Sequence, residues 1–236
     1  MLTASVYILS TAFTPFLQAS LSKNTPIQKE AAQLLQQQVL KEAAWALQQQ
    51  PVTVTASSSP RSAGGKHDFF SEADYFWPDP QNPGGPYIEK DGLTNPDNFV
   101  EHRKAMIRFS KIIGALAAAY KLTGDEKYVK HAVLHLRAWF IDPETRMNPN
   151  LLYAQAVKGR HTGRNYGIID TIHFMEVAQG VLVMEGAAGF SQQTAAGVKE
   201  WFREYNNWLN TSKPGLQEKA IKNNHSTCWA MQVASF

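Results

Sequence analysis

Apolar residues return every three or four positions over much of this chain, separated by polar ones. In residues 26–50, Gln, Lys and Glu alternate with apolar side chains that fall on one helical face, namely Leu34, Leu35, Val39, Ala43 and Leu47. Pro26 stands in the first turn, and Pro51 cannot continue a helix. The pattern predicts an amphipathic helix over residues 26–50.

The same period returns in the second half of the chain. It predicts helices at residues 99–121, 126–140, about 168–185, and from the N-cap Ser191 through Leu209. The turn Leu122-Thr123-Gly124-Asp125 separates two of them, because Gly stops a helix and Asp caps the next. Lys213-Pro214-Gly215 ends the last, and Trp229, Val233 and Phe236 then open a further apolar helix face.

Residues 52–98 and 141–166 follow no helical period. The first of these stretches holds clusters of Ser, Gly and Pro together with many aromatic residues, namely Phe69, Phe70, Tyr75, Phe76, Trp77 and Tyr87. A long irregular segment inside a compact chain is usually functional, and its aromatic content argues against a disordered linker. No segment alternates apolar and polar residues over strand length. We therefore expect an all-α fold of antiparallel helical hairpins, either a solenoid or a toroid; the absence of a fixed sequence repeat weakens the solenoid.

Composition narrows the class of protein further. The chain has 236 residues, of which 44% are hydrophobic and 18% charged, with 23 Lys and Arg against 20 Asp and Glu for a formal net charge of +3. This balance suits an anionic substrate and excludes the dense basic surface of a nucleic-acid-binding protein. A single cysteine, Cys228, excludes an intrachain disulfide framework and a cysteine-based zinc site.

Both ends of the sequence are unusual. Residues 1–19 carry no charge, are apolar in the middle and end in Leu17-Gln18-Ala19, a plausible cleavage site. We expect a cleaved export signal, a periplasmic or secreted protein, and no membrane association after cleavage, since the stretch is short for a transmembrane helix. The chain stops within an apolar helical stripe, so we expect it to be truncated on its C-terminal side. The expected domains are thus the signal at 1–19 and a helical domain at 20–236.

The strongest local motif is Asn223-Asn224-His225-Ser226. An amide and a titratable imidazole within one turn suit a site that neutralises a carboxylate and moves a proton. Two plainer interpretations stay open. Asn223 or Ser226 could cap the following helix, and Asn224-His225-Ser226 is also a glycosylation sequon, as is Asn210-Thr211-Ser212.

Two loops carry further candidate chemistry. Tyr75 and Trp77, in a Pro-rich loop, would offer flat platforms to sugar rings, unless the loop buries them. The segment from Lys158 to Gly167, with Arg160, His161, Arg164 and Asn165, could hold an anion, or be a solvated basic loop.

Two weaker signals involve residues spaced along helices. His131 and His135 have a metal-ligand spacing, but no third ligand is evident, so we take them as ordinary helix histidines and predict no metal. Glu218 precedes His225 by about two turns if the helix is continuous, and neighbouring Lys219 and Lys222 favour an exposed ion pair.

Several segments together resemble the alginate lyase family of polysaccharide lyases. They are Asn223-Asn224-His225-Ser226 with Trp229, the loop from Tyr75-Phe76-Trp77-Pro78-Asp79-Pro80 to Asp91-Gly92, the turn at residues 122–128, and Gly163-Arg164 with Gly167-Ile168-Ile169-Asp170. The resemblance covers about residues 66–236. It implies an (α/α) toroid, here an incomplete barrel, with a groove for an acidic polysaccharide and no cofactor.

The resemblance also implies roles for individual residues. Asn224 and His225 would bind the uronate carboxylate, His225 would be a candidate base, and Glu218 would occupy an acidic catalytic position. Arg164 would hold a neighbouring uronate, with His161 and Asn165 in the same binding segment, and Tyr75 and Trp77 would stack on sugars. The family's catalytic Arg and proton-donating Tyr would fall beyond residue 236, so the resemblance implies little or no activity for this chain alone and a complete lyase if it is part of a longer protein.

Two other functions remain open from the sequence. A glycoside hydrolase of the same fold would need two carboxylates across the scissile bond, with Asp74, Asp79, Asp170 and Glu218 as candidates. A non-catalytic protein that binds acidic polysaccharides would use the aromatic loop and the basic segment alone.

Overall fold

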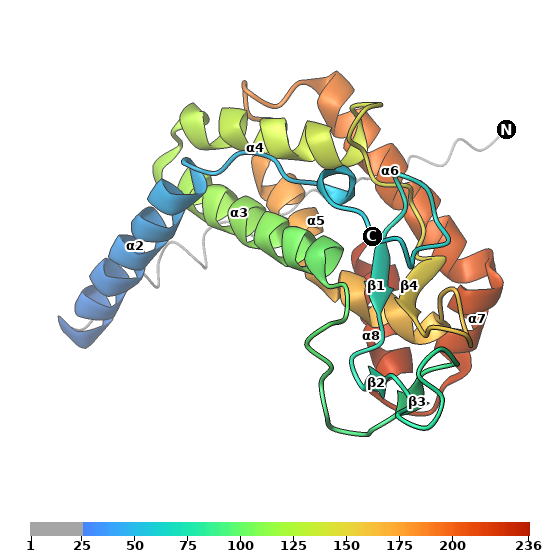
Figure 1. Ribbon diagram of the computed structural model, residues 1–236. Helices are drawn as coiled ribbons and strands as arrows, with labels where there is room; N and C mark the ends of the chain where they lie inside the picture. The colour runs from blue at the N-terminus through green and yellow to red at the C-terminus, as the bar shows by residue number, and fades with distance from the viewer. Residues whose placement is uncertain (1–25) are drawn as a thin grey trace, which may run out of the picture. The chain divides into compact units, whose positions relative to one another are not determined.

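The computed structural model describes residues 26–236 (Figure 1). The predicted export signal at residues 1–19 lies outside the described part of the chain. The chain divides into two units, residues 1–38 and residues 39–236. The described part of the first unit is the beginning of helix α2 (Pro26–Ala46), and the second unit contains all the elements discussed below.

Helices dominate the second unit, as predicted. The α-helices that follow α2 are α3 (Glu101–Thr123), α4 (Glu126–Phe140), α5 (Phe174–Met184), α6 (Gln192–Thr211), α7 (Lys213–Ala220) and α8 (Asn224–Ser235). Two 3-10 segments, η2 (Val54–Ala56) and η3 (Asn165–His173), accompany them. The predicted all-α fold is thus confirmed in its coarser form: the fold is mostly helical, with the short strands described below.

Three helix boundaries differ from the sequence prediction. Helix α2 ends at Ala46 rather than residue 50. The helix predicted at about 168–185 is a 3-10 segment that passes into α5. Lys213-Pro214-Gly215 does end α6, but it also begins the short helix α7, because Ser212 caps α7 and Pro is favoured in a first helical turn.

The turn between α3 and α4 is built as its sequence predicts. Gly124 adopts φ 68° and its N–H donates to the carbonyl of Tyr120, which closes α3. The Asp125 carboxylate then accepts the N–H of Lys127 at the start of α4. The two helices run antiparallel side by side (Figure 1), and they form the first helical hairpin.

An aromatic cluster forms the centre of the core. The rings of Phe109 and Trp139 stack at 4.9 Å, and Phe140 lies 4.5 Å from Trp201. Phe174, at the start of α5, contacts all four rings edge-on. These contacts join α3, α4, α5 and α6 through one continuous apolar interior.

The segment Asn165–Met184 is long and apolar enough to cross a membrane by length and composition, with a mean hydropathy of 1.3. More than half of it is buried inside the protein. Packing of α5 against α3 accounts for its apolar composition, since a helix covered on several sides carries apolar residues on all of them.

Residues 26–236 also contain four very short strands, which the sequence analysis did not predict. Strand β1 (Phe70–Glu72) pairs in parallel with β4 (Tyr153–Ala156), and β2 (Phe76–Trp77) pairs antiparallel with β3 (Ile88–Glu89). Each spans two to four residues, which is too short to establish an alternating pattern. The β1–β4 ribbon ties the two irregular stretches of the chain together.

Helix α8 is fixed to the core by buried polar contacts. The Trp229 indole donates to the Leu209 carbonyl, and the Gln232 amide donates to the Ile168 carbonyl. The Thr171 hydroxyl donates to Gln232 at 2.7 Å and lies 2.5 Å from the Tyr205 hydroxyl. These bonds set the position of α8, and therefore of the Asn-Asn-His motif at its start.

Candidate active site

The Asn-Asn-His motif forms the N-terminus of α8. The Asn223 side chain accepts the backbone N–H of His225 at 2.9 Å, so Asn223 is the N-cap, and the Ser226 hydroxyl donates to the Asn223 carbonyl. Asn224 is exposed in the first helical position. The capping interpretation of Asn223 is thus correct, and it leaves the side chains of Asn224 and His225 available for other contacts.

Glu218 lies directly behind His225. Its Oε1 atom is 2.6 Å from Nδ1 of His225, and its Oε2 atom accepts a hydrogen bond of 2.9 Å from the Asn165 amide. The carboxylate is fully buried. The expected exposed ion pair with lysine is therefore wrong. The helical path is interrupted between α7 and α8, so the Glu218 side chain points inward. The Lys219 side chain lies over the Trp229 ring instead.

The electrostatics of the Glu218–His225 pair follow from the burial of Glu218. Desolvation raises the pKa of Glu218, while the hydrogen bonds from His225 and Asn165 act in the opposite direction. The contact of 2.6 Å requires one proton between Nδ1 and the carboxylate. Whichever atom carries that proton, Nε2 is the ring nitrogen that remains for a ligand.

His225 borders a cavity of about 490 Å³, called here the His225 cavity. It is also lined by Asp74, Tyr75, Phe76, Glu89, Asp91, Gln155, Arg164 and Tyr166, with Ala73 and Ile169. The cavity thus brings together the aromatic loop, strand β4, the start of η3 and the start of α8. An imidazole, a guanidinium and aromatic rings therefore border one cavity.

Arg164 is the cation of this cavity. Its guanidinium lies between the rings of Phe76 and Tyr166, at 5.0 and 5.1 Å, and its Nε and Nη2 atoms donate to the carbonyl and side chain of Gln155. Burial lowers the pKa of Arg164. Within residues 26–236 it forms no ion pair with a carboxylate, so its remaining N–H groups are available to an anion.

The Tyr166 ring meets the His225 ring edge-on at 4.9 Å. Sequence reasoning placed Tyr166 within the basic segment but gave it no role. The contact is a second restraint on the imidazole, beside the bond from Nδ1 to Glu218. Arg164, Tyr166 and His225 therefore form one continuous wall.

Gln155 connects this wall to a buried charged cluster. It adopts φ 48°, the single left-handed non-glycine residue among residues 26–236. Its N–H donates to the Ser71 hydroxyl, which in turn donates to Asp170 at 2.7 Å. Burial raises the pKa of Asp170, and Arg103 opposes that shift. Such hydrogen bonding holds a backbone conformation that an isolated Gln would rarely adopt.

Arg103 binds two of the carboxylates that were candidates for hydrolysis. Its Nη1 atom donates to Asp74 at 2.9 Å, and its Nε atom lies 3.4 Å from Asp170. Burial works against the charge of Arg103, but the two carboxylates outweigh it and raise its pKa. Asp170 is buried, whereas Asp74 borders the His225 cavity with Glu89 and Asp91.

The other residues predicted for the site occupy different places. Tyr75 is exposed at the His225 cavity. Trp77 is turned aside: its indole donates to the Leu93 carbonyl, and Lys90 covers its ring at 5.2 Å. Asn165 holds Glu218, and His161 is exposed at a separate cavity. The structure thus brings together five of the predicted residues, namely His225, Glu218, Asn165, Arg164 and Tyr75.

His131 and His135 contact a backbone carbonyl. Their Nε2 atoms lie 3.0 and 3.2 Å from the oxygen of Gln49, which therefore takes both ring N–H groups. Burial, followed by the neighbouring His131, lowers the pKa of His135 from 6.5 to about 4. Across residues 26–236 no three His, Cys, Asp or Glu side chains are grouped as a metal would require.

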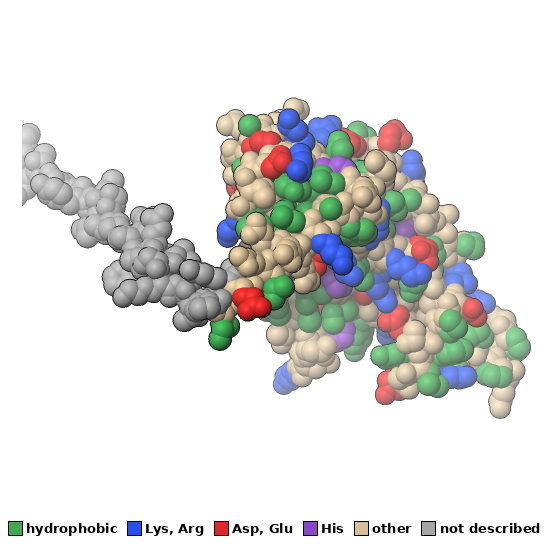
Figure 2. Space-filling model, turned by 90° about the vertical axis from the view of Figure 1, so that its left-hand side faces the viewer, with side chains coloured by type: hydrophobic (Ala, Val, Ile, Leu, Met, Phe, Trp, Pro, Cys, Tyr) green, Lys and Arg blue, Asp and Glu red, His purple; other side chains and the backbone are tan. Residues whose placement is uncertain are grey.

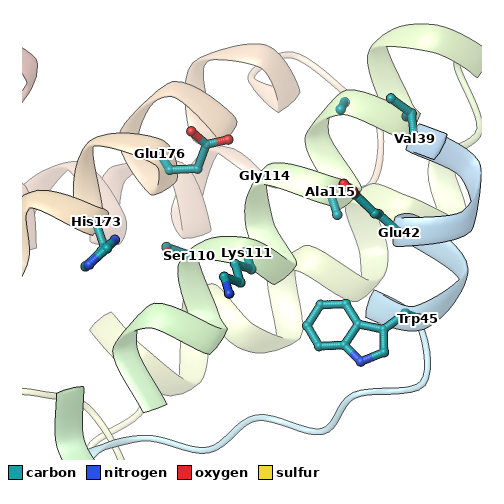
Figure 3. A pocket seen from close by; sticks show the side chains of 10 residues that line it. Val39, Glu42, Trp45, Ser110, Lys111, Gly114, Ala115, His173 and Glu176 are labelled. Atoms are coloured by element: carbon teal, nitrogen blue, oxygen red, sulfur yellow. The ribbon is translucent and has the colours of Figure 1, made fainter. Parts of the chain in front are cut away.

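A further cavity of about 670 Å³ lies between α2, α3 and α5 (Figure 3). Trp45 and Glu42 project from α2 toward α3, where Glu42 lies beside Ala115, while Glu176 of α5 lies against Gly114. None of the residues predicted for catalysis or binding lines it. On the face that Figure 2 shows, acidic and basic side chains are interspersed, in keeping with the small net charge.

These features define a mostly helical protein whose cavity brings an imidazole, a guanidinium and aromatic rings together with three carboxylates. Residues 53–236 match the family model described as "Alginate lyase", and the chain belongs to this family.

A crystal structure of an alginate lyase from Bacteroides ovatus shares 37% sequence identity with the chain, at a TM-score of 0.78. The match covers 85% of this chain and 53% of that one, so the chain spans about half the length of that solved relative. No protein with a curated description matches the chain significantly.

Proposed function

We propose that this protein is a polysaccharide lyase that cleaves alginate or a related polyuronate by β-elimination. The observation that carries the proposal is the buried contact of 2.6 Å between Glu218 and His225 at the edge of a cavity with an unpaired arginine. Membership of the alginate lyase family and the solved alginate lyase support it. On the same grounds we propose that the helical hairpins form part of an (α/α) toroid.

β-Elimination makes three demands on a site. The carboxylate at C6 of the uronate must be neutralised, so that the proton on C5 can leave. A base takes that proton, and the electron pair forms the C4–C5 double bond as the C4–O4 bond breaks. The departing O4 then receives a proton, which the protonated base can return to it, and the product ends in an unsaturated sugar.

Asn224 and His225 meet the first demand in this proposal. The exposed Asn224 amide at the helix N-terminus donates to the C6 carboxylate, where the helix dipole also favours negative charge. The Nε2 atom of His225 faces the same group or abstracts the C5 proton. Glu218, fully buried, does not reach the sugar and acts as a positioning residue that fixes the imidazole.

Arg164 and the aromatic residues bind the neighbouring sugars. The free N–H groups of Arg164 would bind the carboxylate of an adjacent uronate, and Tyr75 would stack on a ring. Trp77 would bind a sugar only if the substrate displaces the Lys90 side chain from the Trp77 ring. The apolar, uncharged residues 1–19 support export to the periplasm or the medium.

Ultraviolet absorbance of the unsaturated product tests this proposal. The full chain is incubated with polymannuronate, polyguluronate and glucuronan, beside Asn224→Ala and His225→Gln variants and a Ser226→Ala control. The family resemblance implies little or no activity for this chain alone, but a protonated His225 can return the abstracted proton to O4. We therefore expect absorbance to rise with at least one polymer for the unmodified protein and the control, and not to rise for the two site variants.

Other outcomes would identify the rival functions. New reducing ends without absorbance would indicate a hydrolase that uses Asp74, Glu89 or Asp91 of the same cavity. Binding of polyuronate without either product would indicate a binding protein.

A further inference from the structure

A second cavity, of about 440 Å³, lies beside the β1–β4 ribbon and shares no lining residue with the His225 cavity. Alternate side chains of a strand point to opposite faces, and the two cavities follow this rule. Glu72 and Ala156 line the second cavity, whereas their neighbours Ala73 and Gln155 line the His225 cavity. We call the second cavity the basic pocket, after Arg61, Lys158, Arg160 and His161 in its wall.

The charge of the basic pocket is largely unopposed. Its one carboxylate, Glu72, is buried and fully engaged, since Arg61 grips it through two bonds of 2.7 and 2.5 Å and the Phe99 N–H donates a third. The charges of Arg61 and Glu72 therefore cancel. Lys158 and Arg160 are exposed and form no ion pair with any residue in 26–236, which leaves two positive charges at the opening.

A tight turn at residues 157–161 fixes the backbone from which the side chains of Lys158 and Arg160 project. The backbone of Val157 exchanges hydrogen bonds of 2.8 and 2.9 Å with His161, and the Arg160 N–H donates to the same Val157 carbonyl. Gly159 at the tip adopts φ 73°, and a Cβ there would lie 2.8 Å from the Cα atom of Pro86. The turn is thus locked by its own ladder and by the loop that packs against it.

We propose that the basic pocket binds the carboxylate of a uronate residue in an acidic polysaccharide, at a site separate from the His225 cavity. Arg160 offers a planar fork to a carboxylate, and the His161 ring adds a further polar contact. Lys158 adds an ammonium group, which lies 5.5 Å from the centre of the Tyr87 ring. Adjacent residues of β4, Gln155 and Ala156, line the two cavities on opposite faces of the ribbon, so a ligand in one cavity leaves the other open. The proposal relies on the proposed function only for the identity of the polymer.

Equilibrium binding of polyuronate tests the site without turnover. Dissociation constants for polymannuronate and polyguluronate blocks are measured at low and physiological salt for the full chain, with dextran as a neutral probe. We expect Lys158→Gln/Arg160→Gln to weaken binding about tenfold or more, because two charge-assisted contacts are lost. The control Lys121→Gln/Lys130→Gln removes the same charge from α3 and α4, which line neither cavity, and should change binding less than about twofold.

A variant that keeps the charges but changes the turn distinguishes a defined binding site from general electrostatic attraction between the protein and the polymer. Gly159→Ala keeps every cation but forces the turn away from Pro86, so it should also weaken binding severalfold while circular dichroism confirms a folded protein. Equal affinities for the pocket pair and the control pair would overturn the proposal, as would unchanged binding by both Gly159→Ala and the pocket pair. Absence of unsaturated product together with the expected contrast in binding would reject the lyase function and leave this site standing.

Discussion

Nδ1 of His225 lies 2.6 Å from Oε1 of Glu218, a carboxylate with no exposed surface seven residues earlier in the chain. Two helices and the break between them are needed to bring these groups together. A buried acceptor on one ring nitrogen fixes the tautomer and the orientation of the other. In the proposed function, this relationship makes His225 a directed base or donor.

Glu218→Gln should therefore impair catalysis more than binding. The amide has nearly the same shape, but it can donate to Nδ1 and so stabilise the opposite tautomer of His225. We expect kcat to fall about 100-fold or more with little change in KM. Steady-state kinetics check this, with Glu200→Gln as a control, since Glu200 pairs with Arg203 on α6. A rise in KM with unchanged kcat would contradict the positioning role.

Arg164 should tolerate lysine poorly. A lysine at this position keeps the charge, but it cannot make both bonds to Gln155 or stack as a plane between Phe76 and Tyr166. We expect Arg164→Lys and Arg164→Ala each to raise KM for polyuronate about tenfold, while the control Arg203→Ala leaves it unchanged. Full activity in Arg164→Lys would show that only the charge matters.

Substitutions of Tyr166 test whether its ring contact with His225 or its hydroxyl group matters for activity. Tyr166→Phe keeps the edge-on contact with the His225 ring, and Tyr166→Ala removes it. The contact is worth about 1 kcal/mol, so we expect near-normal turnover for the phenylalanine variant and a clear loss for alanine. If both variants lose activity equally, the hydroxyl group itself takes part in the reaction.

Stability should fall in acid because of His135. Its pKa in the folded protein is about 4, below the ordinary value of 6.5, since the imidazole is buried. Between these values the unfolded chain binds a proton that the folded protein does not, so the free energy of unfolding decreases as pH falls from 6.5 to 4.

Urea unfolding at pH 8, 7 and 4.5 measures the effect. His135→Gln should be less acid-sensitive than the unmodified protein by about 2 kcal/mol between pH 7 and 4.5. The values at pH 8 give the cost of the substitution itself, including the altered contact with Gln49. Parallel pH dependences in the two proteins would disprove this role for His135.

The sequence predicted those parts of the fold and site that depend on local chemistry. Gly124 and Asp125 mark a helix boundary by backbone preference and capping, and both act as expected. Asn223 and His225 stand in one motif, so the start of α8 was also recognisable. The resemblance to alginate lyases then assigned Arg164 and Tyr75 to the same site.

The remaining features depend on contacts between distant segments. Burial of Glu218 follows from the break before α8 and from Asn165, 53 positions earlier, which no local pattern reveals. The left-handed Gln155 is held by Ser71 and Asp170, which lie in different segments. Trp77 was expected to stack on sugars, but Leu93 and Lys90 occupy its polar edge and its face.

The origin of the oxygen in the product tests β-elimination most directly. A polyuronate is digested by the full chain in water labelled with heavy oxygen, and the fragments are examined by mass spectrometry. We predict that each cleavage gives one unsaturated fragment that is a water molecule lighter than a hydrolysis product, with no label incorporated, and that His225→Gln gives none. Labelled, saturated fragments would contradict the proposed chemistry and assign hydrolysis to the cavity.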